Sequence, residues 1–109
     1  MHVRASVTSS SCPGKPATPV ADATVSMDCP QVIKASGASV LGKTDARGQF
    51  ALDEPLLGRW LHDGCEIVIE KQGFEPERLP VASVCEAYSV NHCTNAVVSA
   101  ELTPLRPCS

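Results

Sequence analysis

Apolar and polar residues alternate along most of this chain, and helical periodicity is nearly absent. Val3, Ala5 and Val7 fall on one face of an extended segment, with Arg4 and Ser6 on the other. Alternation with a period of two is typical of a β-strand that buries one face and exposes the other. The pattern therefore predicts an all-β protein in which each strand sends every second side chain into a shared core.

The alternation predicts seven strands joined by turns, which is the spacing of an antiparallel sandwich. The first strand is the one just described, and residues 39–44 form a further short one. The inward positions of the other five are Ala23, Val25, Met27, Cys29, Phe50, Leu52, Cys65, Ile67, Ile69, Leu79, Val81, Ala96, Val98, Ala100 and Leu102. Pro80 makes 77–81 an edge strand, since proline has no N–H to donate.

The connecting segments predict mostly irregular structure. The prolines of residues 11–22 indicate a stiff exposed loop, and residues 82–95 read as a polar loop flanked by cysteines. A single helical turn is expected at most, around Leu56 to Leu61. No linker or repeat divides the chain, so residues 1–109 are expected to form one domain.

The chain of 109 residues contains six cysteines. An even number at this density is typical of an oxidising compartment and predicts three disulfides, for which fifteen pairings are open. Cys85 and Cys93 flank one loop and are placed to close it locally. The cysteines therefore predict a secreted, periplasmic or cell-surface module, although no signal segment is visible in the chain, and the lack of a long apolar run predicts no membrane insertion.

The charge distribution argues against one class of partner. The net charge is −3, and lysine and arginine form no stripe along the chain. A nucleic-acid-binding protein needs clustered basic side chains to meet the phosphates. No nucleic-acid partner is therefore expected.

The segment Lys43 to Phe50, "KTDARGQF", predicts a tight turn between two strands. Asp45 can accept hydrogen bonds from backbone N–H groups two or more residues later, and Gly48 can adopt the positive φ that such a turn requires. Phe50 then points into the core. A cation or phosphate site at Asp45 would leave most of these residue types unexplained, so we interpret the segment as a structural turn.

Four segments together resemble the carboxypeptidase regulatory-like domain, a transthyretin-like β-sandwich. They are residues 18–27, 44–50, 64–77 and 96–104. The positions that match the family pattern are Pro19, Ala23, Val25, Thr44, Asp45, Gly48, Phe50, Gly64, Gly73 and Phe74. They are turn and core positions, so the resemblance implies a fold rather than an activity. Cys65, where the family commonly has an aromatic residue, and the further cysteines bring the chain closer to the disulfide-bonded Ole e 1-like proteins.

The resemblance also implies a disulfide pattern. In this fold the strand ending at Cys29 and the strand beginning at Cys65 are antiparallel neighbours, which favours a Cys29–Cys65 bridge. With Cys85–Cys93 closed locally, Cys12 and Cys108 remain to join the two ends of the chain. Each bridge is expected to stabilise the fold by roughly 2–4 kcal/mol.

No assembled catalytic motif is visible. A nucleophile elbow of the G-x-S-x-G type is absent, and the carboxylates of Asp53, Glu54, Glu75 and Glu77 lie in turns or near strand edges. The hydroxyisourate hydrolase, which has the transthyretin-like fold, carries a C-terminal Tyr-Arg-Gly-Ser motif, whereas this chain ends in Leu-Arg-Pro-Cys-Ser. We expect no enzymatic activity and no cofactor.

The remaining interpretation is an accessory or adhesion-type module that contacts protein or glycan at the cell surface. Trp60 and Tyr88 are the candidate binding residues, because exposed aromatic side chains serve such contacts. The competing structural interpretation is that Trp60 covers the open end of the sandwich. The sequence leaves the ligand and the oligomeric state open.

The second hypothesis is a metal-binding module. His62, Cys65, His92 and Cys93 supply imidazole and thiol groups, the ligand types of a zinc site. The chain has no CxxC pair, and neighbours on a strand, such as His92 and Cys93, point to opposite faces. This hypothesis requires unpaired cysteines and a bound metal.

Overall fold

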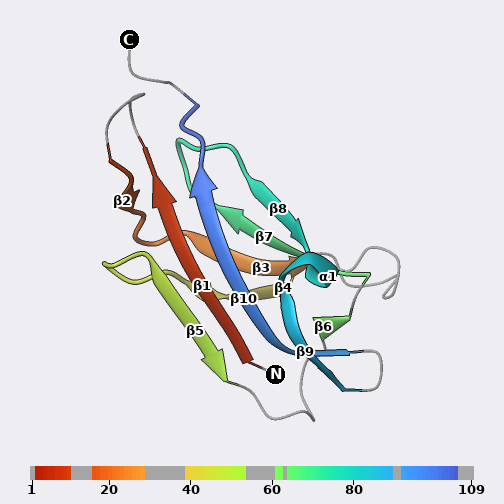
Figure 1. Cartoon of the computed structure of the whole chain (residues 1–109). Helices are drawn as coiled ribbons and strands as arrows, with labels where there is room; N and C mark the ends of the chain where they lie inside the picture. Colours follow the sequence, from red (N-terminus) through yellow and green to blue (C-terminus); the bar gives the residue numbers. More distant parts are fainter. Residues whose placement is uncertain are drawn as a thin grey trace.

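The described part of the chain forms two β-sheets and one very short helix (Figure 1). The structure is a computed structural model that describes residues 2–10, 16–28, 39–53, 61–62, 64–89 and 92–105. The elements are β1 (His2–Ser9), β2 (Thr18–Pro19), β3 (Thr24–Asp28), β4 (Ser39–Lys43), β5 (Gln49–Asp53), β6 (Leu61–His62), β7 (Glu66–Glu70), β8 (Glu77–Pro80), α1 (Val81–Val84), β9 (Cys85–Ser89) and β10 (His92–Leu102).

The first sheet is built around β1 and β10, which lie side by side and run parallel, with Ser9 opposite Leu102 (Figure 1). On its other side β1 pairs with β5 and β2, and β10 pairs with β6 and β9, all antiparallel. The second sheet has the order β4-β3-β7-β8 and is antiparallel throughout. The chain passes from the second sheet to the first through the β4–β5 turn and through α1.

The core lies between the two sheets and follows the alternation of the sequence. The buried apolar residues are Val3, Ala5, Val7, Val20, Ala23, Val25, Met27, Leu41, Phe50, Cys65, Ile67, Val68, Ile69, Val81, Cys93, Ala96, Val98, Ala100 and Leu102. The inward positions predicted for the first, second, fifth and last strands are confirmed wherever the structure describes them. Leu52 and Leu79 are partly buried against the core. At the centre of the second sheet, Ser26 and Val68 lie opposite each other and are buried as well.

The predicted turn between β4 and β5 is confirmed in detail. The Asp45 carboxylate accepts the N–H groups of Arg47 at 2.8 Å and Gln49 at 3.0 Å. Gly48 has φ +71°, and a Cβ added there would collide with the carbonyl oxygen of Val7. Because Gly48 O also accepts the N–H of Val7 at 2.8 Å, the glycine brings the turn directly against β1.

Thr44 joins this turn to the segment that precedes β3. Its buried hydroxyl donates to Val20 O at 2.7 Å and accepts the N–H of Ala23 at 2.9 Å. Its backbone accepts the N–H of Asp22 and donates to Ala23 O, both at 3.0 Å. One threonine side chain therefore holds the two neighbouring turns together.

The sequence analysis was wrong in three respects. The pairing of β1 with β10 is parallel, so the fold is not antiparallel throughout. The segment expected to be a polar loop over residues 82–95 contains most of α1, then β9 and the start of β10. The two strands pair with each other as a hairpin. The strand expected over 77–81 ends at Pro80, and Val81 begins α1, donating its N–H to Cys65 O at 3.1 Å.

The expected strand count was too low, because β2, β6 and β9 were not foreseen. Of the helical turn expected around Leu56 to Leu61, only residue 61 is described, and it lies in β6. Among the described residues, no helix has the length and apolar character needed to cross a membrane.

Candidate functional site

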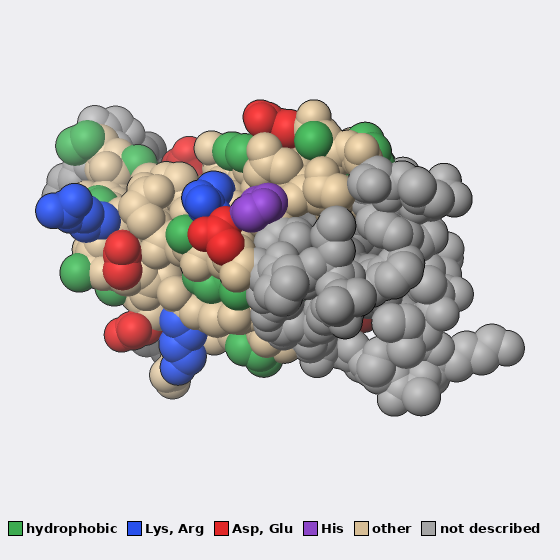
Figure 2. All heavy atoms as spheres, turned by 90° about the horizontal axis from the view of Figure 1, so that it is seen from below, with side chains coloured by type: hydrophobic (Ala, Val, Ile, Leu, Met, Phe, Trp, Pro, Cys, Tyr) green, Lys and Arg blue, Asp and Glu red, His purple; other side chains and the backbone are tan. Residues whose placement is uncertain are grey.

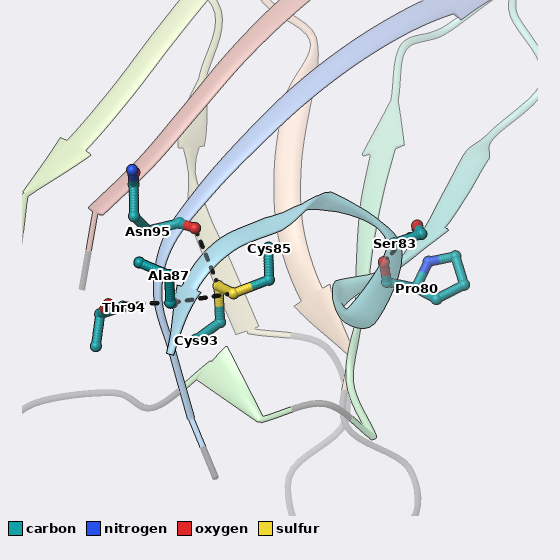
Figure 3. The surroundings of a disulfide bond; sticks show 7 residues. All are labelled: Pro80, Ser83, Cys85, Ala87, Cys93, Thr94 and Asn95. Carbon is teal, nitrogen blue, oxygen red and sulfur yellow. Dashed lines mark hydrogen bonds between the residues drawn. A yellow bond between two sulfur atoms is a disulfide. The ribbon is translucent and has the colours of Figure 1, made fainter. Parts of the chain in front are cut away.

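The hairpin of β9 and β10 carries the disulfide that the sequence predicted. Cys85 and Cys93 are bonded, with their Cα atoms 5.8 Å apart (Figure 3). Their sulfur atoms lie 3.1 and 3.2 Å from the carbonyl oxygens of Ala87 and Asn95; these are close contacts rather than hydrogen bonds, because a disulfide sulfur has no hydrogen to donate. The Thr94 hydroxyl donates to Ala87 O across the hairpin at 3.1 Å. The hairpin is therefore fixed covalently and by a hydrogen bond.

Tyr88, one of the two candidate binding residues, lies on this hairpin. It pairs in register with Cys93, which is 2% exposed, whereas Tyr88 itself is 51% exposed. A rigid backbone thus presents a large amphipathic ring to the surroundings. Trp60, the other candidate, lies outside the described residues.

The four candidate metal ligands are brought together only in part. The pairing of β6 with β10 sets His62 directly opposite His92 in the backbone register. Cys65 and Cys93 are both disulfide-bonded, so neither offers a thiolate in this form of the protein. Among the side chains that the structure describes, no group of three or more His, Cys, Asp or Glu residues is arranged to hold a metal ion.

The other two predicted disulfides involve cysteines outside the described residues, namely Cys12, Cys29 and Cys108. The register of the neighbouring residues is described. Asp28 lies opposite Glu66, which places the residue before Cys29 opposite the residue after Cys65. The parallel pairing of β1 and β10 likewise sets Ser9 beside Leu102, from which the chain runs on towards Cys12 and Cys108.

A charged group joins β1 to β5 on one exposed face, where Figure 2 shows a histidine next to a basic and an acidic side chain. Arg4 Nη1 lies 3.0 Å from Asp53 Oδ1, and His2 Nδ1 contacts the same oxygen at 2.5 Å. The hydrogen bond from His2, followed by that from Arg4, lowers the pKa of Asp53. The group is exposed, so its charges are solvated.

A depression of about 560 Å³ lies where β3 begins, β4 ends and β7 ends. It is lined by Asp22, Thr24, Lys43, Glu70, Lys71, Gln72, Phe74 and Pro76. A second depression of about 320 Å³ shares Lys71 and Phe74 with it and is otherwise lined by Ser9, Thr18, Pro19, Val20, Ala21 and Pro104. The turn between β7 and β8 that carries Phe74 lies beside the end of β10, whereas the Tyr88 hairpin lies beside its beginning (Figure 1).

Sequence analysis placed Gly73 and Phe74 in a family pattern but did not assign the surrounding side chains to a site. They come from the ends of β4 and β7, from the turn before β3 and from the turn after β7. The sequence signal was a local one: Asp22 and Gly73 are turn positions with a positive φ, and Gln72 and Phe74 flank Gly73.

Comparison with known proteins found no match: no protein-family model, no curated protein and no solved structure matches the chain.

Proposed function

We propose that this protein is a non-enzymatic, extracytoplasmic binding module with a transthyretin-like sandwich, which contacts protein or glycan through the hairpin of β9 and β10. The observation that carries the proposal is the 51% exposure of Tyr88 on a strand fixed by the Cys85–Cys93 disulfide. An aromatic ring on a rigid backbone loses little conformational entropy on binding, so most of its contact energy is retained. Trp60 is proposed as a second contact residue.

The cysteine chemistry supports the proposed location. The Cys85–Cys93 bridge is formed and Cys65 is disulfide-bonded. Disulfides persist in oxidising compartments and are rare in the reducing cytosol. The register at Asp28 and Glu66, and at Ser9 and Leu102, supports the proposed Cys29–Cys65 and Cys12–Cys108 bridges.

Two of the acidic side chains with described partners, Asp45 and Asp53, support a non-enzymatic role. Asp45 accepts backbone N–H groups of its own turn, and Asp53 is paired with Arg4. Hydrogen bonds lower the pKa of both carboxyls, which keeps them ionised and unsuited to act as general acids near neutral pH. Both residues are accounted for by the architecture of the sheet.

The proposal is tested by screening the intact, oxidised protein on a glycan microarray and on an array of purified secreted proteins. For the ligand that binds, Tyr88→Ala is expected to weaken the affinity about tenfold or more, as expected for an aromatic contact residue. Val97→Ala serves as the matched control, since Val97 is an apolar residue of β10 with 42% exposure. Binding that Tyr88→Ala and Trp60→Ala leave unchanged would contradict the proposal, as would unfolding of the Tyr88→Ala protein, which would assign the ring to the core.

A metal-binding module that uses His62 and His92 without the cysteines is the second candidate, because Cys65 and Cys93 are disulfide-bonded. The backbone register of His62 with His92 is the observation that favours it, and imidazole is a ligand type of zinc sites. The test is zinc titration of the oxidised protein by calorimetry. Stoichiometric binding that is abolished by both His62→Ala and His92→Ala would support this candidate, and the absence of heat at stoichiometric zinc would eliminate it.

A further inference from the structure

We propose that the depression between Asp22 and Phe74 is a binding site for a neutral oligosaccharide. The proposal rests on the glycan arm of the proposed function but assigns it to a different place, beside the end of β10 rather than on the β9–β10 hairpin. The depression has a volume of about 560 Å³. Pockets for small ligands commonly measure roughly 300–1,000 Å³.

The polar lining of this depression is not used by the fold. The side chains of Asp22, Lys43, Glu70, Lys71 and Gln72 make no hydrogen bond or ion pair with any other residue that the structure describes. By contrast, Arg78 is paired across strands with Asp28 at 3.2 Å, and Arg4 with Asp53 at 3.0 Å. Five polar side chains around one depression therefore retain their full hydrogen-bonding capacity for a ligand.

The balance of this lining selects the class of ligand. Lys43 and Lys71 offset Asp22 and Glu70, so the depression has no net formal charge. It nevertheless presents donors from the ammonium groups, acceptors from the carboxylates and both from Gln72. A molecule with many hydroxyl groups, each of which donates and accepts, matches this set. A strongly anionic or cationic ligand would meet repulsion from half of it.

Phe74 supplies the apolar surface that a sugar ring needs. It is partly buried, packs against the core and lies between the polar depression and the second, more apolar one. Aromatic rings provide a large contact area with little conformational freedom to lose. The C–H face of a pyranose packs against such a ring while its hydroxyls reach the polar side chains at the rim.

The backbone around Phe74 is held in place before any ligand arrives. Phe74 N–H donates to Lys71 O at 3.0 Å, and Glu75 N–H donates to Thr103 O at 2.8 Å. Leu105 N–H donates to Gly73 O at 2.9 Å, which ties the turn to the segment after β10. A site fixed in this way avoids the entropic cost of ordering a loop on binding.

The backbone conformation of Asp22 makes it possible to remove the carboxylate without straining the turn. Its φ is +57°, a left-handed conformation that glycine adopts without steric cost and that other residues adopt less readily. Its N–H is bonded to Thr44 O, but its side chain has no such partner among the described residues. Glycine fits this turn as well, so Asp22→Gly removes the carboxylate at the rim and leaves the backbone conformation unchanged.

The test is titration of the intact, oxidised, ¹⁵N-labelled protein with cellotriose, maltotriose, mannotriose and, as an anionic probe, a heparin-derived tetrasaccharide. We expect saturable shifts of the Asp22, Gln72, Gly73 and Phe74 amides with at least one neutral trisaccharide. Asp22→Gly and Phe74→Leu should each weaken that affinity about tenfold or more, whereas Glu101→Gln, which changes an exposed acid of β10 that does not line the depression, should not change it. Asp22→Gly keeps the preferred backbone, so its effect is readable even if Phe74→Leu fails to fold.

Three outcomes would overturn the inference: no saturable shift at these amides with any neutral probe, preferential binding of the anionic probe, or an affinity unchanged in Asp22→Gly. Tyr88→Ala separates this inference from the proposed function. If Tyr88→Ala abolishes binding to the array ligand and no neutral trisaccharide shifts the amides at the depression, the inference fails and the proposed binding role of the hairpin is supported. If neutral trisaccharides bind at the depression and Tyr88→Ala does not change their affinity, the depression is a binding site independent of the hairpin.

Discussion

Two aspartates in adjacent turns of this molecule differ in whether the fold uses their carboxylates as hydrogen-bond acceptors. The carboxylate of Asp45, between β4 and β5, accepts hydrogen bonds from the N–H groups of Arg47 and Gln49. Asp22, before β3, has a backbone N–H bonded to Thr44 O and a side chain that faces a depression with no partner among the described residues. The first carboxylate is needed to build its turn, and the second is not.

The difference shows how structural and spare polar groups are told apart. Both residues are exposed and both occupy turns, so exposure and sequence context do not distinguish them. The distinction is whether the carboxylate accepts hydrogen bonds from the backbone of its own turn. Removing these groups one at a time tests the distinction.

The largest effect is expected from Gly48→Ala. The substitution forces a Cβ into the carbonyl of Val7 at a position with φ +71°, and the surroundings cannot move without separating the turn from β1. Strain of this kind is expected to cost about 3 kcal/mol. Urea unfolding measures it. Gly73→Ala is the control, since Gly73 has φ +89° but nothing within 4 Å of an added Cβ, and it should cost less. Equal losses would show that the contact with β1 is unimportant.

Thr44→Val should come next, because it separates the two turns. It keeps the shape of the side chain but removes the hydroxyl that donates to Val20 O and accepts from Ala23 N–H. Leaving two buried backbone groups without partners is expected to cost about 2 kcal/mol. The same unfolding experiment measures the loss, with Thr44→Ser as the control that keeps the hydroxyl. A Thr44→Val protein as stable as the wild type would mean that the turns hold independently.

Asp45→Ala should destabilise the protein by less, and its effect should depend on pH. Backbone hydrogen bonds from Gln49 and then Arg47 lower the pKa of Asp45 below its ordinary value of 3.8. The stabilisation is therefore fully present above that ordinary value and is lost as the pH falls through the lowered folded value. Unfolding of both proteins between neutral pH and pH 2 should show the gap between them closing in acid. A gap that stays constant with pH would show that the charge of Asp45 is not involved.

The core was predictable from the sequence because it depends on the spacing of side chains along one strand. Alternation decides which side chains share a face, so Val3, Ala5, Val7, Ile67 and Ile69 were correctly assigned to the interior. The turn at Asp45 was equally local, since an acceptor and a glycine at fixed spacing suffice to define it. The Cys85–Cys93 bridge was predictable for the same reason, because it closes a separation of 8 residues.

The features that the sequence did not predict depend on contacts between residues that are distant in the chain. Alternation does not say which strand lies beside which, so the parallel pairing of β1 with β10 was missed. The register of β9 with β10 shifts between Cys93 and Asn95 and again between Asn95 and Ala96, so the alternation is interrupted and the segment reads as a loop. The depression draws Asp22, Lys43 and Phe74 from three different turns or strand ends, and only the folded chain brings them together.

The most direct test of the distinction between the two turns is the unfolding free energy of Asp45→Ala beside that of Asp22→Gly at neutral pH. Glycine is chosen at position 22 because it accepts φ +57° without strain. The account predicts that Asp45→Ala lowers stability measurably, while Asp22→Gly leaves it within about 0.5 kcal/mol of the wild type or slightly above. A loss in Asp22→Gly as large as that in Asp45→Ala would contradict the account, because the Asp22 carboxylate would then be a structural group rather than one held in reserve for a ligand.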